Sequence, residues 1–134
     1  MSRVRISFMD NAAMLRSARD LLLKLHKGMI DHERAIYEET NGPVNASQFL
    51  TLLLDDADFA WLRRFSSLIV EIDETFDTKE GIDETLIDEL IRRVRELVTL
   101  DEAEDYYRNK YEAALQQNVE LVGIHGELKA LLRK

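Results

Sequence analysis

The chain has 134 residues, the length of a single domain, and its 46% apolar and 33% charged residues are not the composition of a disordered protein. Its net charge of −8 argues against nucleic acid and anionic membrane surfaces as partners, because both are bound by clustered basic side chains. It has no cysteine, no apolar run that could span a membrane and no apolar signal-peptide core, so we expect a cytoplasmic protein without thiolate metal sites.

The first predicted helix runs from an N-cap at Asp10 to about Thr40. Residues 2–9 alternate polar and apolar side chains, which fits either an extended arm or the start of this helix. Gly42 and Pro43 end it, since glycine suits a left-handed C-cap and proline cannot continue a helix. The apolar seam has the three- and four-residue steps of a helical bundle and consists of Leu15, Ala18, Leu22, Leu25, Met29, His32 and Ile36.

A second apolar line on this helix runs through Leu23, Ile30 and Tyr37. A bundle helix needs one wide apolar stripe, and a large exposed patch on a soluble protein usually marks an interface. Two-fold pairing lets such a surface cover its own copy, so we predict a homodimer through this helix. The alternative is that the segment with Phe59 and Trp61 folds over Leu23 and Ile30 within one chain.

The second predicted helix begins at Asn45, which forms a capping-box pattern with Gln48 three residues later. Residues 55–58 interrupt it, and Asp56 can restart the helix as an N-cap, with Asp58 near the positive end of the helix dipole. The second piece extends to about residue 76 on an apolar seam that consists of Leu62, Phe65, Ile69, Ile72 and Phe76.

The third predicted helix follows an N-cap at Asp83. The fourth begins with a capping-box pattern of Asp101 and Glu104 and runs unbroken to about residue 132. Its seam comprises Tyr107, Tyr111, Ala114, Asn118, Leu121, His125, Leu128 and Leu132. Together the four helices predict an all-α fold, an antiparallel up-down four-helix bundle with a break in helix 2, as a single domain over residues 1–134. The residues expected to be almost fully buried are Leu22, Leu25, Ile69, Leu90 and Leu121.

The sequence offers no metal-site motif. None of the three histidines, His26, His32 and His125, has a carboxylate three positions before it, so the Glu-x-x-His motif of carboxylate-bridged metal bundles is absent. His26 and His32 are six residues apart, whereas two histidines that chelate one ion from a helix are normally four apart. We therefore predict no bound metal, no cofactor and no catalytic residue.

A polar patch near the middle of the predicted bundle is the candidate ligand site. Asn118 stands on an apolar seam, level with His26 in an antiparallel arrangement, and a buried amide needs a partner. It could fix the register of the helices, as a seam asparagine does in coiled coils. The other interpretation is a small-ligand pocket lined by His26, Glu33, Trp61 and Asn118.

Two further features indicate close packing or an interface. Gly123 and Gly126 each cost a helix about 1 kcal/mol relative to alanine, which favours the close approach of another helix or aromatic ring, with a ligand or a kink as alternatives. Residues 58–65 combine Phe59, Trp61 and Phe65 with two arginines, which fits either an aromatic core or an interaction hot spot.

Several short strings resemble a group of uncharacterised small helical proteins of bacteria: Leu25-His26-Lys27, Glu33-Arg34, Gly42-Pro43-Val44, Phe59-Ala60-Trp61-Leu62 and Ile72-Asp73-Glu74. The resemblance covers roughly residues 21–76, implies a bacterial cytosolic origin and carries no enzymatic motif. The function that we expect is that of a non-catalytic helical interaction protein, homodimeric, with an unknown protein as a possible further partner. The alternative is a helical domain that binds a small ligand or metal in its core.

Overall fold

A computed structural model describes residues 2–79, 81–101 and 103–133, and all the regular structure in them is helical. The chain order is α1 (Ser2–Asn41), α2 (Ala46–Asp55), the 3-10 helix η1 (Ala57–Leu62), α3 (Arg63–Phe76), α4 (Glu84–Val98), α5 (Asp105–Gln117) and α6 (Val119–Leu132). The predicted all-α class is confirmed. The described residues form six α-helices rather than four, because two of the predicted helices are divided.

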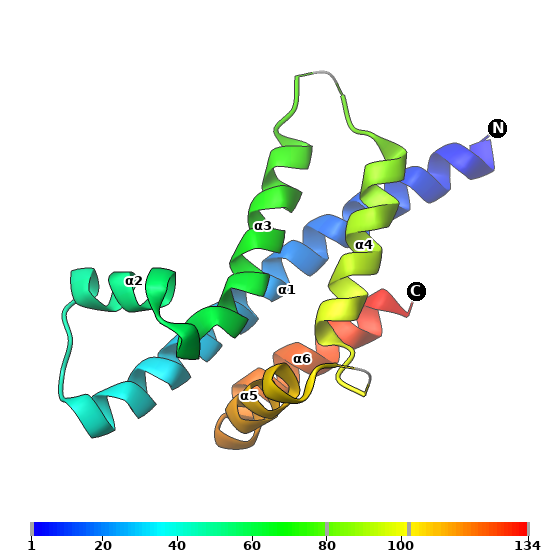
Figure 1. Ribbon diagram of the computed structural model, residues 1–134. Coiled ribbons are helices and arrows are strands. Elements are labelled where there is room, and N and C mark those ends of the chain that lie inside the picture. Colours follow the sequence, from blue (N-terminus) through cyan, green and yellow to red (C-terminus); the bar gives the residue numbers. More distant parts are fainter. Residues whose placement is uncertain (1, 80, 102, 134) are drawn as a thin grey trace.

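The long helix α1 is the element on which the others assemble (Figure 1). It contacts α3, α4, α5, α6 and η1. Residues 2–9 belong to this helix, so Asp10 lies inside it and is not its N-cap. Its end is as predicted: Gly42 has a φ of 82°, and its amide donates to the carbonyl of Glu38 at 2.9 Å.

Local capping places the next elements where the sequence predicts them. The Asn45 side chain accepts from the amide of Gln48 at 2.8 Å, and the Gln48 side chain accepts from the amide of Asn45 at 2.9 Å. Asp56 caps η1 by accepting from the amide of Asp58 at 2.8 Å, and Asp83 caps α4. The predicted break in helix 2 is confirmed, although the chain restarts as a 3-10 helix before α3 begins.

The predicted fourth helix is wrong in two respects. It divides at Asn118, which has extended φ and ψ of −146° and 106° and ends α5 while it caps α6. Its side-chain oxygen accepts from the amides of Glu120 and Leu121 at 3.0 and 3.4 Å. The side chain thus competes with backbone carbonyls for these two amides. At the other end the Asp101–Glu104 capping box does not form, because α5 begins after Glu104 without a side-chain cap.

The core lies along α1, between it and the later helices. All five residues expected to be almost fully buried are buried: Leu22, Leu25, Ile69, Leu90 and Leu121. Ile36, by contrast, is 46% exposed, because the last turns of α1 extend past the helices that cover its middle (Figure 1). Gly28 permits a close approach of α6, since a Cβ atom there would lie 2.2 Å from Cδ2 of Leu121 on α6.

Candidate functional site

An aromatic cluster joins α1, η1, α3 and α5 around Phe65. The Phe65 ring is stacked on His26 at a centroid distance of 6.0 Å and contacts Tyr111 at 5.9 Å. The ring centroids of Trp61 and Tyr107 each lie 6.3 Å from that of Phe65, and the Trp61 ring is edge-on to the Phe65 ring. Every member except the half-buried His26 is buried, so this is core, and the aromatic-core interpretation of residues 58–65 holds for Trp61 and Phe65.

The polar atoms of this cluster serve internal hydrogen bonds. The hydroxyl of Tyr107 donates to the carbonyl of Leu97 at 2.6 Å, and that of Tyr111 lies 2.6 Å from Nδ1 of His125. Burial raises the pKa of both tyrosines far above the ordinary value, so both hydroxyls stay protonated. They tie α5 to α4 and to α6, which is a structural role.

Burial lowers the pKa of His26 and of His125 below the ordinary value of 6.5. The unfolded chain therefore binds more protons than the folded chain as the pH falls from about 6.5, and folding stability declines as the pH falls.

We expect the midpoint of urea denaturation to decrease when the pH is lowered from 7.5 to 5.5. The decrease should be smaller in His26→Gln. The ion pair with Arg93 lowers the pKa of Glu71, so the contribution of this pair to folding stability is lost only at more acidic pH. A midpoint that is flat or rises over this range would contradict the assignment.

An ion pair with one buried partner, Glu33, links α1 to α5. Glu33 is only 4% exposed, and its Oε2 lies 3.5 Å from Nζ of Lys110. Lys110 also lies 5.9 Å from the ring centre of Tyr106, whose hydroxyl donates to the carbonyls of Ala57 and Asp58 at 3.3 and 3.2 Å. The pair compensates the charge of Glu33 and fixes the start of α5 against α1 and η1.

The four residues of the predicted ligand pocket lie in three places. His26 and Trp61 both contact the ring of Phe65, and Glu33 forms an ion pair with Lys110. Asn118 is half-exposed at the start of α6, so its prediction as a buried seam residue is wrong. It lines a separate groove of about 210 Å³ whose other residues include Lys24, Lys27, Gly28 and Asp31.

Within the described residues, no group of three or more histidine, aspartate or glutamate side chains is placed to hold one metal ion. A groove of about 720 Å³ lies between α1 and α3, and two of its charged side chains, Arg19 and Asp73, are paired with one another. There Arg19 binds both carboxylate oxygens of Asp73 at 2.8 and 3.1 Å, and Arg16 lies 4.0 Å over the Phe76 ring. We find no arrangement of nucleophile and base in these residues.

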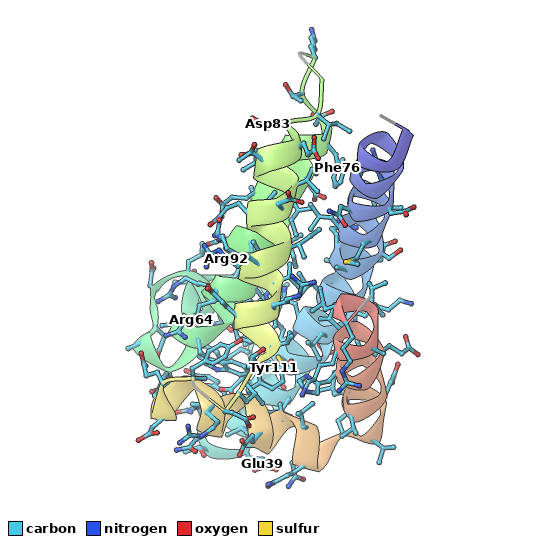
Figure 2. The ribbon with its side chains drawn as sticks, turned by 90° about the vertical axis from the view of Figure 1, so that its right-hand side faces the viewer. Glu39, Arg64, Phe76, Asp83, Arg92 and Tyr111 are labelled. Atoms are coloured by element: carbon cyan, nitrogen blue, oxygen red, sulfur yellow. The ribbon has the colours of Figure 1, made fainter. Side chains whose placement is uncertain are left out.

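The outer face of α6 is an apolar surface that the described part of the chain leaves uncovered. Its inner face packs on α1 through buried Leu121 and Leu128. The opposite face is exposed and uncharged; its members, which we call the α6 outer face, are Val119, Val122, Gly123, Gly126 and Ala130. Val119 is 88% exposed and Val122 50%. In Figure 2 this helix lies along the edge of the molecule in front of α1.

The two glycines of this face do not serve the packing within the chain. A Cβ atom at Gly123 or Gly126 would meet nothing within 4 Å, so no helix or ring of the described chain approaches them. The glycine that permits a close helix approach is Gly28, which the sequence did not single out. A signal for the exposed face was present in residues 121–126, where six positions carry no acidic or basic side chain apart from His125.

The second apolar line on α1 is largely covered within the chain. Tyr37 contacts the ring of Phe59 at a centroid distance of 6.1 Å, and Ile30 packs against the core. Leu23 alone of the three is exposed, at 44%. The predicted intramolecular cover of Leu23 and Ile30 by the segment with Phe59 and Trp61 is therefore wrong for Leu23, and the contact that forms is between Phe59 and Tyr37. With Ile30 and Tyr37 packed within the chain, α1 does not offer the broad free surface that the predicted dimer contact needs.

Comparison with known protein families, with curated proteins and with solved structures finds no match to this chain. The resemblance to uncharacterised bacterial helical proteins therefore stays a prediction. No helix among the described residues is both long enough and apolar enough to cross a membrane. What can be inferred about function rests on the surfaces and side chains described above.

Proposed function

We propose that this is a non-catalytic interaction protein that forms a homodimer, with the α6 outer face as its interface. The observation that carries the proposal is that α6 is apolar on two opposite sides while the chain covers only one of them. Helices that are apolar all round are normally buried all round. The two exposed glycines add to this support, because they allow the backbone of a second helix to approach closely.

The charges beside the α6 outer face favour a second copy of the chain as the partner. At 100° per residue, exposed Glu120 and Glu127 fall along one edge of the face and exposed Lys129 falls along the other. Arg133, just past the end of α6, lies on the same side as Lys129. Two copies related by a two-fold axis parallel to α6 set the acidic edge of each against the basic edge of the other. Glu127 and Lys129 are then offset by only about 3 Å along the axis.

The proposed interface replaces the predicted one on helix 1, since α1 is largely covered. A light-scattering measurement at micromolar concentration is expected to give about twice the 15.6 kDa of one chain. Val122→Asp places a charge in the apolar contact and is expected to weaken the dimer by about 100-fold or more. Val70→Asp is the matched control, because Val70 on α3 is 52% exposed and should leave the mass unchanged.

A monomeric mass for the unmodified protein would overturn the proposal. Equal dissociation by Val70→Asp and Val122→Asp would also overturn it, because the effect would then come from added charge and not from the α6 outer face. Circular dichroism of each variant verifies that the helices are retained, so that loss of the dimer is not loss of the fold.

A small-ligand function in the core is the second candidate. It is favoured by Trp61 Nε1 and His32 Nε2, which are buried and have no hydrogen-bond partner among the described residues. A ligand with an acceptor group could satisfy the indole N–H beside Phe65. Trp61 is the only tryptophan in the chain, so its fluorescence reports such binding directly. A small-molecule screen without any change in that fluorescence would remove this candidate.

We also propose the finer architecture as an antiparallel up-down bundle. Its support is the course of the chain in Figure 1, where α1, α3, α4 and α6 succeed one another in alternating directions. In that view α2 and η1 form a side arm, and α5 is the first half of the predicted fourth helix. The cytoplasmic location expected from the sequence likewise stays a prediction.

A further inference from the structure

A groove of about 550 Å³ lies where α3, α4 and the start of α5 meet. Three arginines line it: Arg63 and Arg64 from the first turn of α3, and Arg93 from α4. Figure 2 shows Arg64 on the side of the molecule where these helices come together. The remaining lining is mainly apolar and includes Ala60, Leu68, Leu97 and Tyr107, together with one carboxylate, Glu96, which pairs with Arg92 outside the groove. Two basic segments about thirty residues apart in sequence thus bring three guanidinium groups to one groove on a chain of net charge −8.

Arg63 is held in place without a neutralising carboxylate. Its Nη1 donates to the carbonyls of Leu53 and Leu54 at 2.8 and 3.1 Å, and it makes no ion pair with the described acidic residues. The first turn of α3 contains Arg63 and Arg64 and no acidic residue.

The other two arginines pair with exposed carboxylates, and Arg64 also lies over an aromatic ring. Nη2 of Arg64 lies 3.4 Å from Oε2 of Glu104, and its guanidinium lies 4.5 Å over the ring of Tyr107. Nη2 of Arg93 lies 2.5 Å from Oε2 of Glu71. Exposed ion pairs of this kind contribute at most about 1 kcal/mol, so a ligand that binds guanidinium groups with two oxygens can replace them.

We propose that this groove binds a small organic anion, a phosphate monoester with an apolar body. The phosphate oxygens contact the guanidinium groups of Arg63, Arg64 and Arg93, which match them in geometry as well as in charge. The apolar body lies against Leu68, Leu97 and the edge of the Tyr107 side chain. The volume lies within the range of about 300–1,000 Å³ that is usual for small-ligand sites. This site is separate from the α6 outer face and does not rest on the proposed dimer.

The test is a titration of the full chain with phenyl phosphate, followed by backbone amide chemical shifts at low salt. Saturable shifts are expected around Arg63, Ser67 and Leu97. Arg64→Gln is expected to weaken binding about tenfold, as for the loss of one charge-assisted contact. The matched control is Lys27→Gln on α1, which also removes an exposed cation paired with a carboxylate, Asp31, but does not line the groove.

Three results would overturn the proposal. The first is the absence of saturable shifts with phenyl phosphate. The second is equal weakening by Arg64→Gln and Lys27→Gln, which would indicate attraction to net charge alone. The third is equally tight binding of inorganic phosphate, because the apolar lining would then contribute nothing. Arg93→Gln provides an independent variant on another helix, and it is expected to weaken binding in the same direction as Arg64→Gln.

Discussion

Phe65→Ala is expected to lower the free energy of unfolding by about 3–5 kcal/mol, the range for a buried phenylalanine. Phe65 is fully buried and contacts four other rings, so its removal leaves a cavity that joins α1, η1, α3 and α5. Because whole domains are stable by only about 5–15 kcal/mol, the variant should be partly unfolded near physiological temperature. Urea denaturation at a fixed protein concentration measures the change.

The matched control for Phe65→Ala is Phe76→Ala, the same change at the other end of α3. Phe76 is only partly buried and packs under Arg16, so its loss is expected to be clearly smaller. Equal losses at the two positions would mean that Phe65 is not the centre of the aromatic cluster.

Leu121→Ala is expected to lower the free energy of unfolding by about 2–5 kcal/mol. It is also expected to turn Gly28→Ala from a destabilising substitution into a stabilising one. In the natural sequence the new methyl group at residue 28 meets Cδ2 of buried Leu121, and such overpacking costs about 1–3 kcal/mol. This outweighs the gain of about 1 kcal/mol in helix propensity. Once Leu121 is alanine the obstruction is gone, and Gly28→Ala should be stabilising.

A double-mutant cycle measures this coupling, and Leu128→Ala supplies the control. Leu128 is another buried leucine of α6, but it is not among the closest neighbours of a Cβ at residue 28. Gly28→Ala should therefore remain destabilising in the Leu128→Ala background. If Gly28→Ala has the same effect in all three backgrounds, α1 and α6 do not pack at the described register.

What the sequence predicts well is local. The caps at Asn45, Asp56 and Asp83 form because each involves atoms within three residues of one another, so that no tertiary information is needed. The regular apolar seam of residues 107–132 concealed the break at Asn118, because α5 and α6 both turn apolar sides to the core. Asn118 is a favoured N-cap residue with Glu120 in the following turn, and this was the available signal.

The contacts that the sequence does not predict join segments that are far apart in the chain. Glu33 and Lys110 are 77 residues apart, and neither has a local pattern that names the other. The same holds for Gly28 with Leu121 and for the three arginines of the groove. The predicted pocket of His26, Glu33, Trp61 and Asn118 assumed an unbroken fourth helix. With that helix divided, Asn118 serves as a cap and lies apart from the aromatic cluster.

The central proposal is self-association through the α6 outer face, and cysteine crosslinking tests it most directly. The chain has no cysteine, so a single one introduced at Val119 or at Ala130 can form a disulfide only with its counterpart in another chain. The parallel pairing predicts that both variants oxidise rapidly to a covalent dimer, whereas Val70→Cys, which is exposed on α3, does not. In an antiparallel pair these positions would be offset by about 16 Å. Crosslinking of Val119→Cys and Ala130→Cys no faster than Val70→Cys would contradict the proposed interface.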